Sequence, residues 1–279
     1  MHPWYRNWQN PAHAVQFDGR ARLDLRNLIR NYEAFNDVRL LNERVERSRA
    51  FELLEVGCAT GEFVRYLRAR FPRVHYIGLD VSEPAIARAR AKYPEVPFFV
   101  VQANRNLTEA LRDLGIMRQP DIVYSKDVVQ HQVRPFEFLS NLIEVASEAI
   151  ILRCRTRDVG TTVLDPERSC QFYEGDWLPY IVLNLQELVE WVRAKVPEGE
   201  VVLYRHHMVL GGQHGRFLPK ELYRKETGTA ETAVGIFKQT QRPGSTVIDD
   251  QPDQTPTGTW DYRMRSAVRH TVGLLRSAR

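Results

Sequence analysis

The sequence predicts an α/β fold in which a mostly parallel sheet of seven strands carries helices on both faces, ends in an antiparallel strand and follows a helical lead-in. One observation is that short apolar runs alternate with helix-like segments between residues 51 and 152. Another is that the first apolar run ends in a turn of small residues at 57–61, whereas the next ends on Asp80. Such alternation is typical of right-handed βαβ units, whose parallel strands are covered on both faces.

The predicted elements follow the chain in order. Residues 1–50 form the helical lead-in, because apolar side chains such as Leu25, Leu28 and Tyr32 recur at helical spacing. The central domain spans residues 51–238. Its strands are expected near 52–56, 74–79, 97–102, 121–125, 149–154, 200–210 and 230–238, and its helices near 84–92, 135–148 and 184–195.

Three segments depart from this alternation. Residues 156–183 mix glycine, threonine, aspartate and aromatic residues, which predicts an inserted loop over the strand ends. Residues 239–260 are polar and contain prolines, as linkers do. Residues 261–279 predict a basic amphipathic helix that docks on the domain or on a second subunit, or makes peripheral contact with an anionic membrane. The sequence is compatible with an oligomer.

The composition limits the class of protein. The 279 residues, 43% of them hydrophobic, suffice for one large buried core. No apolar run reaches 18 residues and no apolar leader follows Met1, so a cytoplasmic location is expected. Three scattered cysteines predict reduced thiols rather than a disulfide framework. A net charge of +4, spread along the chain, gives little support for a nucleic-acid partner, and none is expected.

The turn at 57–61 suits a small-molecule cofactor. Its small residues, Gly57, Ala59 and Gly61, let the backbone approach a ligand closely, and an acid that ends the second strand can accept both hydroxyls of a ribose. A dinucleotide fingerprint would require glycine where this chain has Ala59 and Glu62. The sequence therefore favours a nucleoside cofactor without phosphates.

The run Glu55-x-Gly57-x-Ala59-x-Gly61 resembles the first motif of the class I S-adenosylmethionine-dependent methyltransferases, a Rossmann-like family in which an acid usually precedes Gly-x-Gly-x-Gly. The resemblance extends over roughly residues 50–155 and includes the fourth-strand run 120–131. It implies S-adenosyl-L-methionine as the cofactor. The residues that it implies for cofactor binding are Glu55, Gly57, Cys58, Ala59, Gly61, Asp80, Val81, Gln102, Ala103 and Lys126.

Two positions differ from the family pattern. Ala59 stands in place of the central glycine, and its added methyl group predicts a φ angle below zero there. Gln102 stands where the family often has an aspartate that contacts the adenine amino group. Its amide oxygen can accept the same hydrogen bond, so both differences are compatible with cofactor binding.

Catalysis is predicted at the end of the fourth strand. Methyl transfer to a hydroxyl requires alignment of the acceptor and removal of its proton. His131 is the predicted general base, since imidazole titrates near neutral pH; the alternative is that it caps or packs the following helix. Asp127 lies four residues earlier and would share its helical face, as a second catalytic residue or as a cap near the methionine moiety.

The acceptor is predicted to contact the loop after the fifth strand, where aromatic and acidic residues gather as a substrate site or as a packed lid. The predicted substrate-binding residues are Tyr173, Asp176, Trp177 and Tyr180. Three aromatic residues near the N-terminus, Trp4, Tyr5 and Trp8, are expected to help close the pocket. The neighbouring histidines His206 and His207 would point to opposite faces of a strand, so no metal site is predicted.

The predicted function is an S-adenosylmethionine-dependent methyltransferase that methylates an oxygen of a small molecule or of a glycan sugar. A catalytically inactive, cofactor-binding partner subunit is the first alternative. RNA or protein methylation is another, although the fourth strand is not followed by an Asn-Pro-Pro-Tyr-like run. A nucleotide-dependent oxidoreductase is a third alternative.

Overall fold

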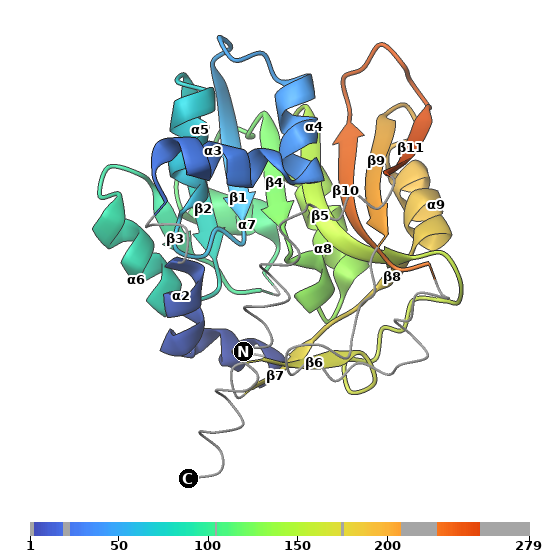
Figure 1. Ribbon diagram of the computed structural model, residues 1–279, viewed down its shortest axis with the longest axis horizontal. Coiled ribbons are helices and arrows are strands. Elements are labelled where there is room, and N and C mark those ends of the chain that lie inside the picture. The colour runs from blue at the N-terminus through green and yellow to red at the C-terminus, as the bar shows by residue number, and fades with distance from the viewer. Residues whose placement is uncertain (1–2, 19–22, 104, 174–175, 208–227, 252–279) are drawn as a thin grey trace.

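The computed structural model describes residues 3–18, 23–103, 105–173, 176–207 and 228–251, and a large sheet forms its centre (Figure 1). The strands are β1 (Phe51–Val56), β2 (Val74–Asp80), β3 (Phe98–Val100), β4 (Ile122–Lys126), β5 (Ala149–Arg157), β6 (Cys170–Tyr173), β7 (Asp176–Pro179), β8 (Leu183–Asn184), β9 (Glu200–His207), β10 (Ala230–Phe237) and β11 (Thr246–Gln251). Eight of them lie in the order β11-β9-β10-β5-β4-β1-β2-β3, β8 pairs with the end of β5, and β6 and β7 form a separate hairpin.

The directions of the strands confirm the predicted fold class. Strands β1 to β5 are parallel wherever they pair, and β10 is antiparallel to both of its neighbours, β5 and β9. The sheet has nine strands among the described residues, however, and not seven. The two further strands are the short β8 and the edge strand β11.

Strand β11 lies within the segment 239–260, so the prediction of a linker was wrong for residues 246–251. The strand runs parallel to β9, Val247 packs against the core, and Arg205 donates a hydrogen bond to Asp250 at 2.9 Å. Ile248 remains 46% exposed. An edge strand is solvated along one side and tolerates polar residues, so its composition resembles that of a linker.

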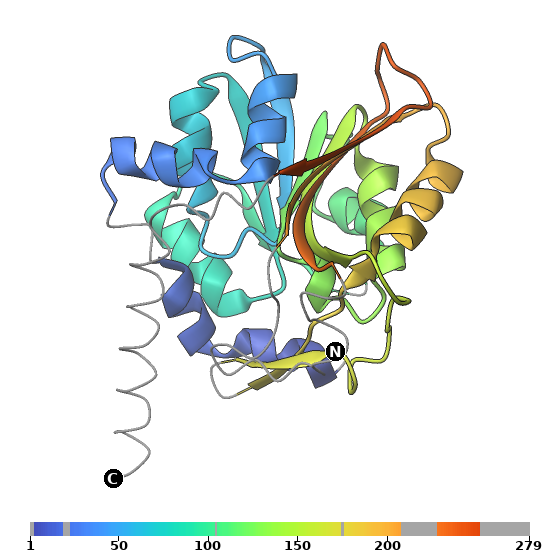
Figure 2. The same cartoon turned by 45° about the vertical axis from the view of Figure 1, so that its right-hand side comes forward.

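Helices cover both faces of the sheet (Figures 1 and 2). One face carries α3 (Leu25–Glu33), α4 (Asn36–Arg44), α5 (Phe63–Arg70) and α6 (Glu83–Lys92), and the other carries α7 (Leu107–Asp113), α8 (Pro135–Val145) and α9 (Leu185–Lys195). Successive strand residues alternate between the two cores, as Leu53 and Leu54 do. Both faces of the central strands are therefore buried, which explains why they are continuous apolar runs.

A further layer lies across the carboxyl ends of the parallel strands (Figures 1 and 2). It consists of the hairpin β6–β7 and of α1 (Pro3–Arg6), η1 (Asn7–Gln9) and α2 (Pro11–Phe17). The Gln9 amide donates to the Val81 carbonyl at 2.6 Å and accepts from the Glu83 N–H at 3.1 Å. Asp18 pairs with Lys92 at 2.7 Å. These contacts hold the N-terminal residues against the carboxyl ends of the parallel strands.

The predicted basic helix at 261–279 lies outside the described residues. Within the described part of the chain, no helix is both long enough and apolar enough to cross a lipid bilayer.

Candidate active site

A cavity of about 1090 Å³ lies between the carboxyl ends of the parallel strands and the layer that covers them. This volume is at the upper end of what a single drug-sized ligand occupies, so it has room for a cofactor and a second molecule. Nine of the ten residues predicted to bind the cofactor line it. These are Glu55, Gly57, Cys58, Ala59, Asp80, Val81, Gln102, Ala103 and Lys126.

The turn after β1 is held against the end of β2 by backbone hydrogen bonds. The N–H groups of Gly57 and Cys58 donate to the Leu79 carbonyl at 2.8 and 3.0 Å. Gly57 has a φ of +88°, and a Cβ atom there would lie 2.1 Å from a methyl carbon of Val128. Only glycine fits this position, because any side chain meets both the φ penalty and the contact.

Ala59 has a φ of +48°, so the prediction of a negative φ was wrong. A left-handed conformation costs a non-glycine residue about 1–2 kcal/mol. The Ala59 N–H donates to Asp80 Oδ2 at 2.8 Å, and a hydrogen bond to a charged group contributes a comparable free energy, about 1.5–3 kcal/mol. The carboxylate of a distant residue therefore holds a conformation that alanine alone disfavours.

Asp80 joins the two turns that form the cofactor side of the cavity. Its second oxygen, Oδ1, accepts the Ser82 N–H at 2.8 Å. Burial raises the pKa of Asp80 above its ordinary value, although the backbone N–H groups of Ser82 and Ala59 oppose this shift. Each carboxylate oxygen can accept a second hydrogen bond. Asp80 is thus able to accept the two hydroxyls of a ribose while it holds both turns in place.

Glu55 and Lys126 bring a carboxyl group and an ammonium group to the same cavity. Burial raises the pKa of Glu55 to about 7, against the opposing effects of a hydrogen bond from Tyr76 and of the Lys126 charge. The Lys126 ammonium lies 3.7 Å from the centre of the Phe35 ring. An amino-acid end group carries an ammonium and a carboxylate, and this pair could contact both.

Glu62 occupies the place of the third glycine of a dinucleotide fingerprint. Its side chain is 6% exposed, lines the cavity and pairs with Lys92. A pyrophosphate at this position would face a buried carboxylate, and like charges at short range repel strongly in a low dielectric. The residues present therefore fit a nucleoside without phosphates and do not fit a dinucleotide.

Gly61 is the tenth predicted cofactor residue, and it is not among the residues that line the cavity. Its φ is +74°, and a Cβ atom would lie 2.6 Å from the Phe98 ring. Gly61 allows the start of α5 to approach β3 closely.

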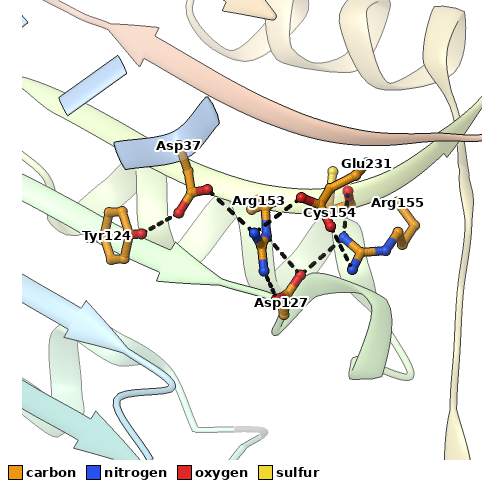
Figure 3. A network of polar contacts seen from close by, with 7 residues as sticks. All are labelled: Asp37, Tyr124, Asp127, Arg153, Cys154, Arg155 and Glu231. Carbon is orange, nitrogen blue, oxygen red and sulfur yellow. Dashed lines mark hydrogen bonds and ion pairs between the residues drawn. The ribbon is translucent and has the colours of Figure 1, made fainter. Parts of the chain in front are cut away.

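Asp127 directly follows β4 and lines the cavity, with a φ of +59°. It belongs to a network of buried charges (Figure 3). Arg153 donates from Nε at 3.1 Å and from a second nitrogen, and Arg155 donates at 3.0 Å. Burial alone would raise the pKa of Asp127, but the charges of Arg153 and Arg155 outweigh burial and hold the pKa well below its usual range. These contacts favour a structural anion over a proton acceptor.

The network continues away from the cavity to Asp37 and Glu231 (Figure 3). Arg153 Nη1 lies 3.1 Å from Glu231 and 3.7 Å from Asp37, and Asp37 also accepts a hydrogen bond from the buried Tyr124. A buried arginine that loses one of its carboxylates costs several kcal/mol. The end of β4 that carries Asp127 is therefore linked through the arginines of β5 to β10 and α4.

His131 lies in η3 (Val129–His131), and its side chain lines the cavity. Its Nδ1 lies 2.8 Å from the Pro179 carbonyl oxygen, which can only accept a hydrogen bond. The proton of a neutral ring is therefore on Nδ1, and Nε2 is the nitrogen that can take up a proton. Trp8 and Tyr180 pack edgewise against the ring, with centroids 5.1 and 5.8 Å away.

The predicted acceptor residues lie in the β6–β7 hairpin or directly after it, and not all of them reach the cavity. Tyr180 is buried and lines the cavity. Trp177 does not line it; its ring is 43% exposed and packs on Phe172. The strands pair the backbones of Tyr173 and Asp176, whose side chains lie outside the described part of the structure.

Other cavity residues were predicted incompletely or not at all. Tyr5 and Trp8 line the cavity as expected for the N-terminal aromatics, whereas Trp4 does not. Nothing in the sequence singles out the cavity residues Gln130 and Gln171, which come from segments that are far apart in the chain.

Comparisons with known proteins agree with this geometry. A protein-family model described as a methyltransferase domain matches residues 54–148. Trans-aconitate 2-methyltransferase of Acidovorax sp. (strain JS42) is 33% identical over 87 residues, which are 31% of this chain and 31% of that protein. Malonyl-[acyl-carrier protein] O-methyltransferase of Bacillus cereus (strain ATCC 14579) is 29% identical over 106 residues, 38% of this chain and 35% of that protein. The matched part thus spans about a third of these relatives.

A solved structure shares the fold over a longer stretch. It is the O-methyltransferase of a trans-AT PKS multienzyme of Brevibacillus brevis in complex with S-adenosyl-L-homocysteine. The TM-score is 0.52 at 12% identity, and the match covers 80% of this chain and 78% of that one. The fold is therefore the α/β fold of this methyltransferase structure. Residues 54–148 are similar to the methyltransferase domain that the family model describes.

We predict that Gly61→Ala lowers the free energy of unfolding by about 3 kcal/mol or more, because a φ penalty of about 1–2 kcal/mol adds to the contact with Phe98. Gly115→Ala is the matched control, since Gly115 has the same φ of +74° but no atom within 4 Å of an added Cβ. Urea denaturation measures both variants. Equal losses would contradict the assignment of Gly61 to packing.

We predict that Glu55→Gln changes how stability depends on pH. In the folded wild type Glu55 keeps its proton up to about pH 7, whereas in the unfolded chain it releases it near its ordinary pKa of 4.5. The stability that the folded protein has while Glu55 is protonated is therefore fully present below pH 4.5 and is lost as the pH rises to about 7. Relative to wild type, the variant should gain up to about 3 kcal/mol over this interval.

Denaturant unfolding at pH 4.5, 5.5, 6.5 and 7.5 measures this difference. Glu137→Gln, an exposed substitution in α8, serves as the control and should follow the wild type. A Glu55→Gln difference that stays constant over this range would show that the pKa of Glu55 is not raised in the folded protein.

Proposed function

We propose that this protein is an S-adenosylmethionine-dependent methyltransferase that methylates a hydroxyl oxygen of a small molecule or of a glycan sugar. The observation that carries the proposal is that one cavity contains both the Asp80-linked turns and an oriented histidine. Its volume of about 1090 Å³ has room for a cofactor and a second molecule. The similarity to known methyltransferases supports methyl transfer, and the relative from Bacillus cereus and the structural neighbour from Brevibacillus brevis are both O-methyltransferases.

The cofactor side supplies binding. Asp80 would accept the ribose hydroxyls, Gln102 would accept from the adenine amino group, and Glu55 with Lys126 would contact the amino-acid end. S-adenosylmethionine supplies a methyl group on a cationic sulfur, which a correctly placed oxygen can attack. The protein has to align that oxygen and remove its proton.

His131 is the residue proposed to remove the proton. The Pro179 carbonyl fixes the ring so that Nε2 accepts, and Trp8 with Tyr180 limits its rotation. Of the two roles expected for Asp127, a second catalytic residue or a cap near the methionine moiety, the catalytic role is not assigned to it. Its arginine contacts keep it ionised and engaged, so it would hold the strand end rather than take a proton.

An inactive cofactor-binding partner subunit would share the cofactor side of the cavity. The oriented Nε2 of His131 favours an enzyme, because a protein that only binds the cofactor does not require a proton acceptor there.

We predict that the protein binds S-adenosylhomocysteine and that Asp80→Asn weakens binding by about 10- to 100-fold, because an amide replaces one of the two ribose acceptors with a donor. Isothermal titration calorimetry measures both proteins. Asp113→Asn, an exposed substitution on α7, is the control. An unchanged dissociation constant for Asp80→Asn would remove Asp80 from the site, and no binding by the wild type would remove the proposal.

We predict that His131→Ala lowers kcat by about 100-fold or more, the usual contribution of a general base. S-adenosylhomocysteine affinity should change less than about threefold, since His131 lies apart from the ribose-binding carboxylate. The loss of kcat/KM at low pH, which reports protonation of the base in the wild type, should disappear in the variant. Activity within a few-fold of wild type would exclude His131 as the base.

A further inference from the structure

Outside the turn after β1, three buried side chains that line the cavity, none of them among the predicted cofactor residues, carry polar atoms without a hydrogen-bond partner among the described residues. They are Gln130 in η3, Gln171 in β6 and Arg155 in β5, with exposures of 2%, 4% and 8%. The atoms concerned are Oε1 of each glutamine and Nε of the arginine. An unpaired buried polar group costs about 1–3 kcal/mol, so three in one cavity wall indicate that something else satisfies them.

These side chains lie next to the hairpin and to the aromatic rings around His131, and they are not among the residues predicted to bind the cofactor. The backbone carbonyl of Gln130 accepts from Ile181 at 2.7 Å, which attaches η3 to the segment after the hairpin. Gln171 pairs with Leu178 across the hairpin, and both are buried. The aromatic rings of Trp8 and Tyr180 line the same cavity and pack on His131. The three polar groups therefore share the cavity with the proposed base.

The charge of Arg155 is already compensated. Its Nη1 donates to Asp127 at 3.0 Å and its Nη2 lies 3.1 Å from Glu231. With Arg153 as the second cation and Asp37 as the third carboxylate, these ion pairs join two cations and three carboxylates. Within this described cluster, Arg155 therefore has no excess positive charge to balance an anionic acceptor, and a buried, unbalanced carboxylate costs several kcal/mol.

We infer that Gln130, Gln171 and the Nε of Arg155 form an acceptor subsite that recognises a neutral polyhydroxyl compound and discriminates against its carboxylate counterpart. This inference rests on the proposed function. A glutamine amide offers a donor and an acceptor on one group, and vicinal hydroxyls offer both in return, whereas a carboxylate can only accept. The aromatic rings supply the apolar walls against which the C–H faces of a sugar ring or cyclitol pack.

The test compares matched pairs of acceptors on the full-length protein saturated with S-adenosylhomocysteine. The probes are myo-inositol, glucose against glucuronate, and galactose against galacturonate, with contact detected by saturation-transfer NMR. We expect contact with neutral members, at an affinity at least about tenfold higher than that of the matching uronate. Preference for a uronate, or contact with no neutral member, would overturn the inference.

Variants test the residues. Gln130→Leu and Gln171→Leu should each weaken binding of the neutral probe by about tenfold, the value of one hydrogen bond. Their melting temperatures should stay equal or rise, because leucine has a similar volume and removes an unpaired buried amide. This combination separates ligand recognition from a structural role, which would lower the melting temperature. Gln186→Leu, exposed on α9, is the control. Unchanged probe affinity in both variants would overturn the assignment.

Calorimetry with S-adenosylhomocysteine separates a failure of the polyhydroxyl subsite from a failure of the proposed methyltransferase function. If the cofactor product binds but the uronates are preferred, the polyhydroxyl subsite is wrong and the methyltransferase proposal stands. If S-adenosylhomocysteine does not bind at all, the proposed function fails first, and the subsite inference fails with it.

Discussion

The carboxylate of Asp80 receives the Ala59 N–H on one oxygen and the Ser82 N–H on the other, and the rest of the site depends on this link. It joins the turn after β1 to the turn after β2, and it stabilises the left-handed backbone of Ala59. The turn after β1 is also held to β2 itself by the Leu79 carbonyl, which accepts from the Gly57 and Cys58 N–H groups. The N-terminal layer then attaches to the same place, because Gln9 bonds to Val81 and Glu83.

A second constraint fixes the other side of the cavity. Arg153 and Arg155 lie on one face of β5, and their guanidinium groups bind Asp127 at the end of β4 and Glu231 on β10. The network connects three neighbouring strands close to their ends. It holds the strand end that leads to η3, where His131 and Gln130 lie. The position and the charge of the proposed acceptor side thus both depend on the ion pairs of two buried arginines.

The cofactor side could be predicted from sequence because its signals are local. Apolar runs that end in a small-residue turn or in an acid identify strand ends, and the carboxyl ends of parallel strands meet at one edge of the sheet. The φ of Ala59 could not be predicted in this way, since it depends on Asp80, 21 residues away. Strand β11 was missed because an edge strand and a linker have similar compositions.

The acceptor side was harder to predict because it is assembled from distant segments. In the β6–β7 hairpin, Gln171 pairs with Leu178 and Phe172 pairs with Trp177, and successive residues of a strand point to opposite faces. The face with Gln171 is buried on the cavity, whereas Trp177 is largely on the surface. Aromatic content singled out Trp177, but the register of the hairpin decides which residues reach the cavity.

A crystal structure of the protein with S-adenosylhomocysteine would show whether Asp80 and His131 contribute to one active site. We expect the ribose hydroxyls on Asp80, the amino-acid end between Glu55 and Lys126, and the sulfur facing the part of the cavity that His131 lines. A nucleoside bound elsewhere, or a sulfur that faces away from His131 with no path to it, would show that the two residues do not form one site.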